Sequence, residues 1–234
     1  SASEVKTPEK ICDEMVALFP DDFLRNVAES GGRLLDIASK TAEFPLALYK
    51  RMKTLGIDEE KIKACLYTIP TSKMTYEFTL KFFRILGLNE DHIASFTSYD
   101  LLEVRNEKDE IDYDRITKLL TQNKPFNQIK LTDEPQEGED PVKFEAVVGN
   151  PPYQELDGGA QKSARPIYQE FVYVGERLSK QYLSLITPTR WFSGGKGLDE
   201  FREHMLNDSH IKSLHDYMHP EDVFPDTNNR GGIC

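Results

Sequence analysis

Cysteine is scarce in this sequence, and its spacing matches no metal site. The 234 residues include three cysteines, Cys12, Cys65 and Cys234, without a CxxC pair or a nearby cysteine–histidine set. Four of the five histidines fall within residues 204–219, but they lack the tight ligand spacing of a zinc site. We therefore expect no metal centre, and unpaired cysteines are typical of a cytoplasmic protein.

Long apolar runs and a secretory leader are also missing. No stretch approaches the roughly 20 apolar residues of a membrane-spanning helix. Ser1 is not followed by the charged and then apolar segments of a signal peptide. We expect neither a membrane-embedded nor a secreted protein.

The chain has fewer basic residues than acidic ones. Lys and Arg total 29 against 40 Asp and Glu, so the net charge is −11 at pH 7. A DNA-binding surface normally gains affinity by neutralising phosphates, and this chain alone is expected to bind DNA weakly. It stops at Gly232-Ile233-Cys234 without a final helix, so we expect it to be part of a longer protein.

The most informative motif is Asn150-Pro151-Pro152-Tyr153, which directly follows the apolar run 144–149. Such a run is typical of a buried strand. The two prolines remove backbone donors and fix φ, which turns the carbonyls of Asn150 and Pro151 outward. Two carbonyl oxygens and a flat ring suit a planar amine such as a base flipped out of a duplex. A plain proline turn is the alternative interpretation.

Strand and helix patterns alternate along the chain, which predicts a doubly wound, mainly parallel α/β sheet. A first helix is expected after the Thr7-Pro8 N-cap and first turn, and a second at 21–30. The later strands are expected at 33–36, 63–69, 93–96, 144–149, 182–186 and 211–217. The later helices are expected at 43–52, 72–86, 112–121, 167–178 and 198–206.

Polar residues follow three of the predicted strands: Asp36, Asp100 and Asn150. Ligands of doubly wound sheets bind beyond the carboxyl ends of the strands, where these residues are expected to lie. Taken singly, the two aspartates also fit a simple role as loop or helix-cap acids.

The order of these motifs resembles that of the amino-group-specific DNA methyltransferases, in particular the adenine-N6 enzymes of restriction-modification systems related to Eco57I and TaqI. The resemblance extends from about Lys6 to the last residue. It implies a Rossmann-like catalytic domain at 33–234, a helical segment at 1–32 packed on it, and a target-recognition domain beyond Cys234. It also implies S-adenosylmethionine as the methyl donor and double-stranded DNA as the partner.

The resemblance implies two sets of site residues. The catalytic set is Asn150, Pro151, Pro152 and Tyr153, with Phe224 of the segment Asp222-Val223-Phe224-Pro225 packed against the flipped base. The cofactor-binding set matches three family motifs and comprises Thr7, Pro8, Asp36, Ala38, Phe44, Asp100 and Leu101.

The sequence departs from the family pattern in its cofactor loop. Lys40 and Ala42 stand where glycines are usual, and a turn without glycine loses freedom at positive φ and room for close backbone approach. The second strand ends at Ile69-Pro70, where the family usually has an acid for the ribose hydroxyls. We therefore expect weakened or reshaped cofactor binding.

The resemblance implies methyl transfer to the exocyclic N6 of adenine, as part of a restriction-modification system. Three alternatives stay open at this point. Glutamine methylases that act on translation release factors carry the same four-residue motif. A methylase-like module that has lost cofactor binding would serve as a scaffold or DNA-binding part. Cytosine-N4 methylation is a lesser variant, usually associated with serine in place of Asn150.

Overall fold

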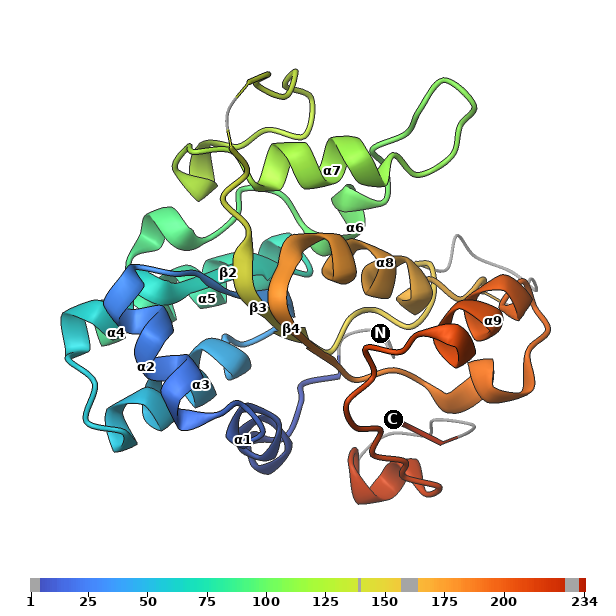
Figure 1. Cartoon of the computed structure of the whole chain (residues 1–234), viewed down its shortest axis with the longest axis horizontal. Coiled ribbons are helices and arrows are strands. Elements are labelled where there is room, and N and C mark those ends of the chain that lie inside the picture. The colour runs from blue at the N-terminus through green and yellow to red at the C-terminus, as the bar shows by residue number, and fades with distance from the viewer. Residues whose placement is uncertain (1–4, 139, 157–163, 226–231) are drawn as a thin grey trace.

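A computed structural model describes residues 5–138, 140–156, 164–225 and 232–234. Across these ranges, four parallel strands form one sheet in the order β2-β1-β3-β4, with helices on both sides (Figure 1). The strands are β1 (Leu34–Ser39), β2 (Leu66–Pro70), β3 (Phe144–Gly149) and β4 (Ser179–Leu185). The α/β fold predicted from the sequence is confirmed.

The helices lie between and around these strands, and α5 shows the usual capping at both ends. Ser72 forms a capping box with Thr75 at the start of α5, and Gly87 ends that helix in the left-handed conformation with φ of 66°. The helices of the described chain are α1 (Glu9–Ala17), α2 (Asp21–Ser30), α3 (Glu43–Thr54), α4 (Glu59–Cys65), α5 (Lys73–Leu86), α6 (Ser98–Leu101), α7 (Tyr113–Leu120), α8 (Tyr168–Leu178) and α9 (Asp199–Asn207).

Both faces of the sheet are buried. Leu34 and Val148 lie in one apolar core with side chains of α1 to α5, whereas Leu35 and Val147 lie in a second core with side chains of α7 and α8. Figure 1 shows these two helical layers on opposite sides of the strands. A parallel sheet covered on both faces explains why its strands have nearly continuous apolar sequences.

Helices α1 and α2 pack on the same face as α3. Lys50 of α3 forms ion pairs with Glu9 at 2.6 Å and Asp13 at 3.1 Å, both on α1. Val16 of α1 and Leu24 of α2 are buried in the core that contains Leu34. The boundary at residue 32 between a helical segment and the catalytic domain stays a prediction.

The strand predictions at 93–96 and 211–217 are wrong. Ile93 is joined to Thr68 by an isolated parallel bridge, because a 3₁₀ helix ends at His92 and α6 begins at Ser98, leaving too few residues for a ladder. In the second segment, Tyr217 forms an isolated antiparallel bridge with Ile233. The apolar residues that suggested this strand, Ile211 and Leu214, are 41% and 52% exposed and face no core.

The predicted start of the second strand at Lys63 is also wrong. Asp58 caps α4 by accepting hydrogen bonds from the backbone N–H groups of Glu60 and Lys61. The helix therefore continues to Cys65, and β2 begins at Leu66 without an intervening loop.

The strand order places a topological switch point between β1 and β3. The chain leaves β1 toward β2 on one side, and it leaves β3 toward β4 on the other. The register pairs Asp36 of β1 with Val148 of β3, so β3 ends at Gly149 about two residues before β1 ends at Ser39. Ligands of open α/β sheets bind in the crevice at such a point.

Candidate functional site

The loops after β1 and β3 meet closely at the switch point. A Cβ atom added to Gly149 would lie 3.0 Å from Ile37 Cγ2 and 3.3 Å from Asp36 Oδ1. Contacts this short leave little room for a side chain. Glycine at this position thus allows the residue after it, Asn150, to approach the end of β1.

Asn150 is the centre of the site and is only 3% exposed. Its side-chain Nδ2 donates to Thr7 Oγ1 at 3.1 Å. Its main-chain oxygen accepts a hydrogen bond from Lys40 Nζ at 2.9 Å. Its side-chain Oδ1 is buried and has no hydrogen-bond partner within the described ranges. Asn150 Oδ1 is therefore fixed in direction and available to accept a hydrogen bond.

Thr7 was expected to cap the first helix and to hold the cofactor. The capping prediction is wrong: Pro8 is the N-cap residue of α1, and no side chain of the described residues caps that end. The hydroxyl group of Thr7, which is fully buried, lies on Asn150 instead. Its observed contact is with the predicted catalytic amide.

The rest of the catalytic motif is packed into the interior. Pro151 and Pro152 are buried. Tyr153 packs against the apolar core that contains Phe224, which is 2% exposed. The hydroxyl group of Tyr153 is buried without a partner in the described part of the chain, and burial raises its pKa. The two aromatic residues predicted to hold a base thus belong to one cluster; their contact with a base stays a prediction.

Asp36 lies at the β1 side of the site and is 1% exposed. Its Oδ1 accepts a hydrogen bond from the backbone N–H of Ala38 at 3.1 Å. Its Oδ2 is buried with no partner among the residues that are described. Burial, and next the nearby Glu43 carboxylate, raise the pKa of Asp36 well above its ordinary value.

The loop between β1 and α3 is held together by its own charged side chains. Glu43 Oε2 accepts from the backbone N–H groups of Lys40 at 3.2 Å and Thr41 at 2.6 Å. Ala42 has φ of 57° and ψ of 31°, so it takes the left-handed conformation expected of the family's glycine. Sequence reasoning identified Lys40 and Ala42 as departures but missed Glu43. An acid at the start of a helix is so common that it gave no signal.

The remaining cofactor-set residues lie near this end of β1. Phe44 is buried in the core below α3, and Leu101 is buried in the opposite core. Asp100 is exposed, and its Oδ2 accepts a hydrogen bond from the backbone N–H of Thr97 at 2.7 Å. Ser98, which the sequence reasoning missed, donates its hydroxyl group to the carbonyl of Ile37 at 2.8 Å. This bond ties α6 to the end of β1.

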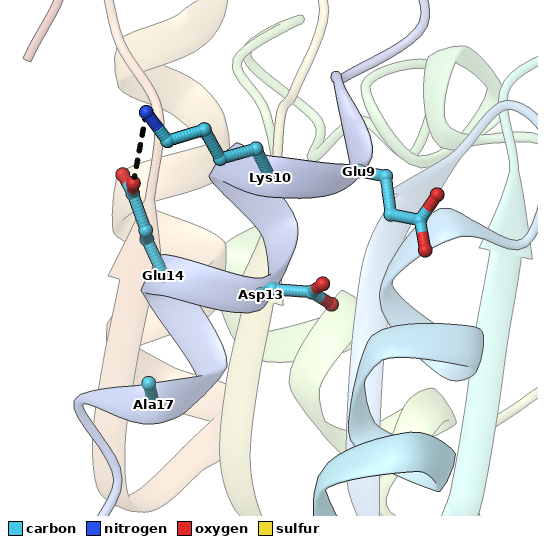
Figure 2. A pocket seen from close by; sticks show the side chains of 5 residues that line it. All are labelled: Glu9, Lys10, Asp13, Glu14 and Ala17. Atoms are coloured by element: carbon cyan, nitrogen blue, oxygen red, sulfur yellow. Dashed lines mark ion pairs between the residues drawn. The ribbon is translucent and has the colours of Figure 1, made fainter.

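A surface hollow on α1 is a different feature. Its lining residues are Glu9, Lys10, Asp13, Glu14 and Ala17. Figure 2 shows Lys10 and Glu14, an ion pair at 3.7 Å, on one side of the helix and the other two acids on the opposite side. Glu9 and Asp13 bind Lys50, so these two acids hold α1 against α3. None of the predicted site residues lines the hollow.

Over the described residues, no group of three or more His, Cys, Asp or Glu side chains is placed to hold a metal ion. Over the same ranges, no helix is both long and apolar enough to cross a membrane.

Comparison with known proteins places these observations in context. A family model described as Eco57I restriction-modification methylase matches residues 57–224. An uncharacterised adenine-specific methylase from Mycoplasma pneumoniae is 31% identical over 96 residues, which cover 40% of this chain and 23% of that protein. The family match includes Asp100 and the catalytic motif, whereas Thr7 and Asp36 lie outside it.

Two solved structures resemble this fold. The cryo-EM structure of a DrdV–DNA complex aligns with a TM-score of 0.52 and 15% identity, covering 86% of this chain and 22% of that one. The methyltransferase subunit of a type I restriction-modification system from Streptococcus thermophilus aligns with a TM-score of 0.51 and 15% identity, covering 88% of this chain and 39% of that one. This chain thus spans well under half of each of these relatives, and at such identity the likeness concerns the fold.

Proposed function

Because the chain belongs to the Eco57I restriction-modification methylase family, we propose that it methylates DNA at the N6 of adenine with S-adenosylmethionine as methyl donor. The observation that carries this proposal is the state of Asn150. Its amide nitrogen is held by Thr7, and its buried Oδ1 has no partner in the described ranges. That oxygen is available to accept an N–H of an exocyclic amine.

The chemistry follows from the weakness of adenine N6 as a nucleophile, since its lone pair is delocalised into the ring. In the proposed mechanism, Asn150 Oδ1 and the Pro151 carbonyl oxygen accept hydrogen bonds from the two N–H groups of the amine. The nitrogen is drawn toward a tetrahedral form whose lone pair faces the methyl donor. Because these hydrogen bonds strengthen as charge develops on the nitrogen, they favour the transition state over the ground state.

The residues at the end of β1 fit the methionine part of the proposed cofactor. Asp36 Oδ2 and Glu43 Oε1 are both buried carboxylate oxygens without partners in the described chain. Two such acceptors suit an α-ammonium group. When bound, S-adenosylmethionine supplies an activated methyl group on its sulfonium. Asp36 and Glu43 would bind its ammonium group, and Asp100 would bind its adenine.

The proposed partner is double-stranded DNA, and its sequence would be read by a recognition domain beyond Cys234. The net charge of −11 supports this assignment of DNA binding to another domain, because phosphate binding needs positive charge that this chain has in deficit. The catalytic motif would then receive one base extruded from the duplex, between Tyr153 and Phe224.

The experiment is DNA methylation by an Asn150→Ala variant, in a version of the protein that carries the DNA-recognition domain. Transfer of labelled methyl groups to DNA should fall at least about a hundredfold, as when a transition-state hydrogen-bond acceptor is lost. Circular dichroism should stay unchanged. Asn123→Ala, on an exposed loop residue, is the matched control and should keep full activity. Undiminished methylation by Asn150→Ala would contradict the mechanism.

A further inference from the structure

Lys40 joins the two loops of the site, although its side chain is almost fully buried. It follows the last residue of β1 and is 4% exposed. Lysine is rarely buried unless its charge is compensated. Here the Asp36 carboxyl lies nearby: burial and Glu43 raise the pKa of that group, and Lys40 lowers it. The Lys40 ammonium group also donates to the main-chain oxygen of Asn150 at 2.9 Å, across 110 residues of sequence. A compensated charge therefore reaches from the loop after β1 into the catalytic motif.

The atom that Lys40 contacts belongs to a peptide group without an N–H. This peptide joins Asn150 to Pro151, so its carbonyl oxygen is the only group through which a hydrogen bond can fix it. The Pro151 ring fixes φ, and the proline that follows restricts ψ of Pro151. The direction of the Pro151 carbonyl relative to the Asn150 side chain then depends mainly on ψ of Asn150, which the bond from Lys40 restricts.

The two proposed acceptors of the amine are thus fixed from different directions. The Asn150 side chain is oriented by its bond to Thr7 Oγ1 at 3.1 Å. The Asn150 main chain, which leads to the Pro151 carbonyl, is held by Lys40. The proposed activation of the amine needs both oxygens at once, and a misplacement of about 1 Å can cost about a hundredfold in rate. A contact that fixes one oxygen against the other therefore matters for the reaction.

The backbone of Lys40 is itself fixed within the loop after β1. Glu43 Oε2 accepts from the backbone N–H groups of Lys40 at 3.2 Å and Thr41 at 2.6 Å. Ala42 donates its N–H to Ser39 Oγ at 3.1 Å. The Lys40 side chain therefore extends from a firmly held turn, and its ammonium group is a well-placed donor for the opposite loop.

From this geometry we propose that Lys40 is a positioning residue for methyl transfer: through the Asn150 main-chain oxygen, it aligns the Pro151 carbonyl with Asn150 Oδ1. This role rests on the proposed function, because it needs these two oxygens to hold an amine. It also explains the use of a lysine where the family usually has glycine. Since Lys40 bonds the acceptor loop, its loss should slow the transfer step and leave cofactor affinity nearly unchanged.

The first test is single-turnover transfer of labelled methyl groups to DNA, in a version of the protein that carries the DNA-recognition domain. Lys40→Met keeps the length of the side chain but loses the hydrogen bond, so the rate at saturating S-adenosylmethionine should fall at least about tenfold. Circular dichroism should stay unchanged. Lys81→Met, an exposed change on α5, is the matched control and should keep the wild-type rate.

Calorimetry on the same variants separates transfer from binding. The affinity of Lys40→Met for S-adenosylmethionine and for its product S-adenosylhomocysteine should change by less than about threefold. Two effects of losing the lysine oppose each other: a charge that repels the cofactor ammonium group disappears, and Asp36 becomes harder to ionise. A role in fold or cofactor binding alone would not give a slow transfer step at normal affinity.

An NMR measurement tests the contact without any activity. Asn150-Pro151 is the one Asn-Pro pair in the sequence, so ¹³C in asparagine carbonyls and ¹⁵N in proline give a single coupled signal. In Lys40→Met this carbonyl signal should move to lower chemical shift, because the carbonyl loses a hydrogen bond from an ammonium group. Lys81→Met should leave the signal in place.

The outcomes separate the role of Lys40 from the proposed function. A wild-type transfer rate in Lys40→Met, or a loss explained wholly by weaker cofactor binding, overturns the positioning role and leaves the proposed function standing. An unmoved carbonyl signal in Lys40→Met does the same. If the wild-type protein transfers no methyl group to DNA, the proposed function fails and the positioning role fails with it.

Discussion

The two loops that meet at the switch point are built in different ways. The loop after β3 is fixed by shape: Gly149 permits close approach, two buried prolines restrict the backbone, and one hydrogen bond that Asn150 Nδ2 donates to Thr7 Oγ1 orients the amide. The loop after β1 is fixed by charge, with Lys40 and Glu43 bonded to backbone groups.

This difference indicates that the two halves of the site respond to different variables. Apart from the Lys40 contact that the two loops share, the loop after β3 is held by prolines and by a neutral hydrogen bond, neither of which titrates. The loop after β1 adjoins Asp36 of β1, whose pKa is raised by burial and by Glu43, so protonation of Asp36 changes the electrostatics of this loop. The geometry of the methyl-acceptor side should therefore change little with pH, whereas binding on the cofactor side should depend on pH.

The strongest test of the comparison is Gly149→Ala, because this glycine joins the two loops. The new methyl group would lie 3.0 Å from Ile37 Cγ2 and 3.3 Å from Asp36 Oδ1, so these two side chains or the loop must shift slightly to make room. We expect unfolding free energy to fall by about 1–3 kcal/mol in urea titrations. We expect methylation to fall at least about tenfold, since a shift well below 1 Å already misplaces Asn150 against the proposed methyl acceptor.

Gly56→Ala is the control for this substitution. Gly56 also has a positive φ, 74°, but no atom lies within 4 Å of its added Cβ in the described chain. It should lose about 1 kcal/mol of stability from backbone strain and keep full activity. If Gly149→Ala behaved in the same way, the close joining of the two loops would have no functional role.

Asp36→Asn tests the charge-dependent half. Burial and Glu43 raise the pKa of Asp36, so the folded chain binds this proton more tightly than the unfolded chain does. The stability that Asp36 contributes should therefore be fully present below the ordinary Asp pKa of about 4 and should be lost as pH rises toward the higher folded-state pKa. Asparagine cannot ionise, so the variant should lose this decline and be more stable than wild type at pH 8.

The same variant should bind the proposed cofactor poorly. Losing one charge-assisted hydrogen bond to the α-ammonium group should weaken both S-adenosylmethionine and S-adenosylhomocysteine by about ten- to a hundredfold. Asp114→Asn, an exposed change on α7, controls for the lost charge. Equal stability slopes with pH in Asp36→Asn and wild type would show that Asp36 is not the titrating group.

Thr7→Val tests the shape-dependent half. Valine has nearly the same shape but no oxygen, so Asn150 Nδ2 would be left buried without an acceptor. Such an orphaned donor costs about 1–3 kcal/mol. We expect that loss in urea unfolding and about a tenfold lower methylation rate, because the amide is free to rotate. Thr7→Ser keeps the oxygen and should restore both; failure to do so would mean that packing by the Thr7 methyl group matters more than the bond.

The two halves also differ in how well the sequence predicted them. The catalytic motif was found because a strand, a rigid loop and its polar residue are adjacent in sequence. The contacts that complete the site link Asn150 to Lys40 and to Thr7 over 110 and 143 residues. No local pattern encodes such pairs. An apolar run likewise misled the strand assignment at 93–96, because three buried residues, Ile93, Ala94 and Phe96, between two short helices look the same as a short strand.

The smallest expected effect comes from Asp100→Asn, which separates two parts of the cofactor side. Asparagine keeps an oxygen for the Thr97 N–H, so α6 should persist and the melting temperature should change little. Because the proposed contact of Asp100 is with adenine, which both ligands share, calorimetry should show each weakened by about threefold and their ratio unchanged. A changed ratio in Asp100→Asn would mean that Asp100 acts on the sulfur end of the ligands, where alone they differ, and would contradict its proposed contact with adenine.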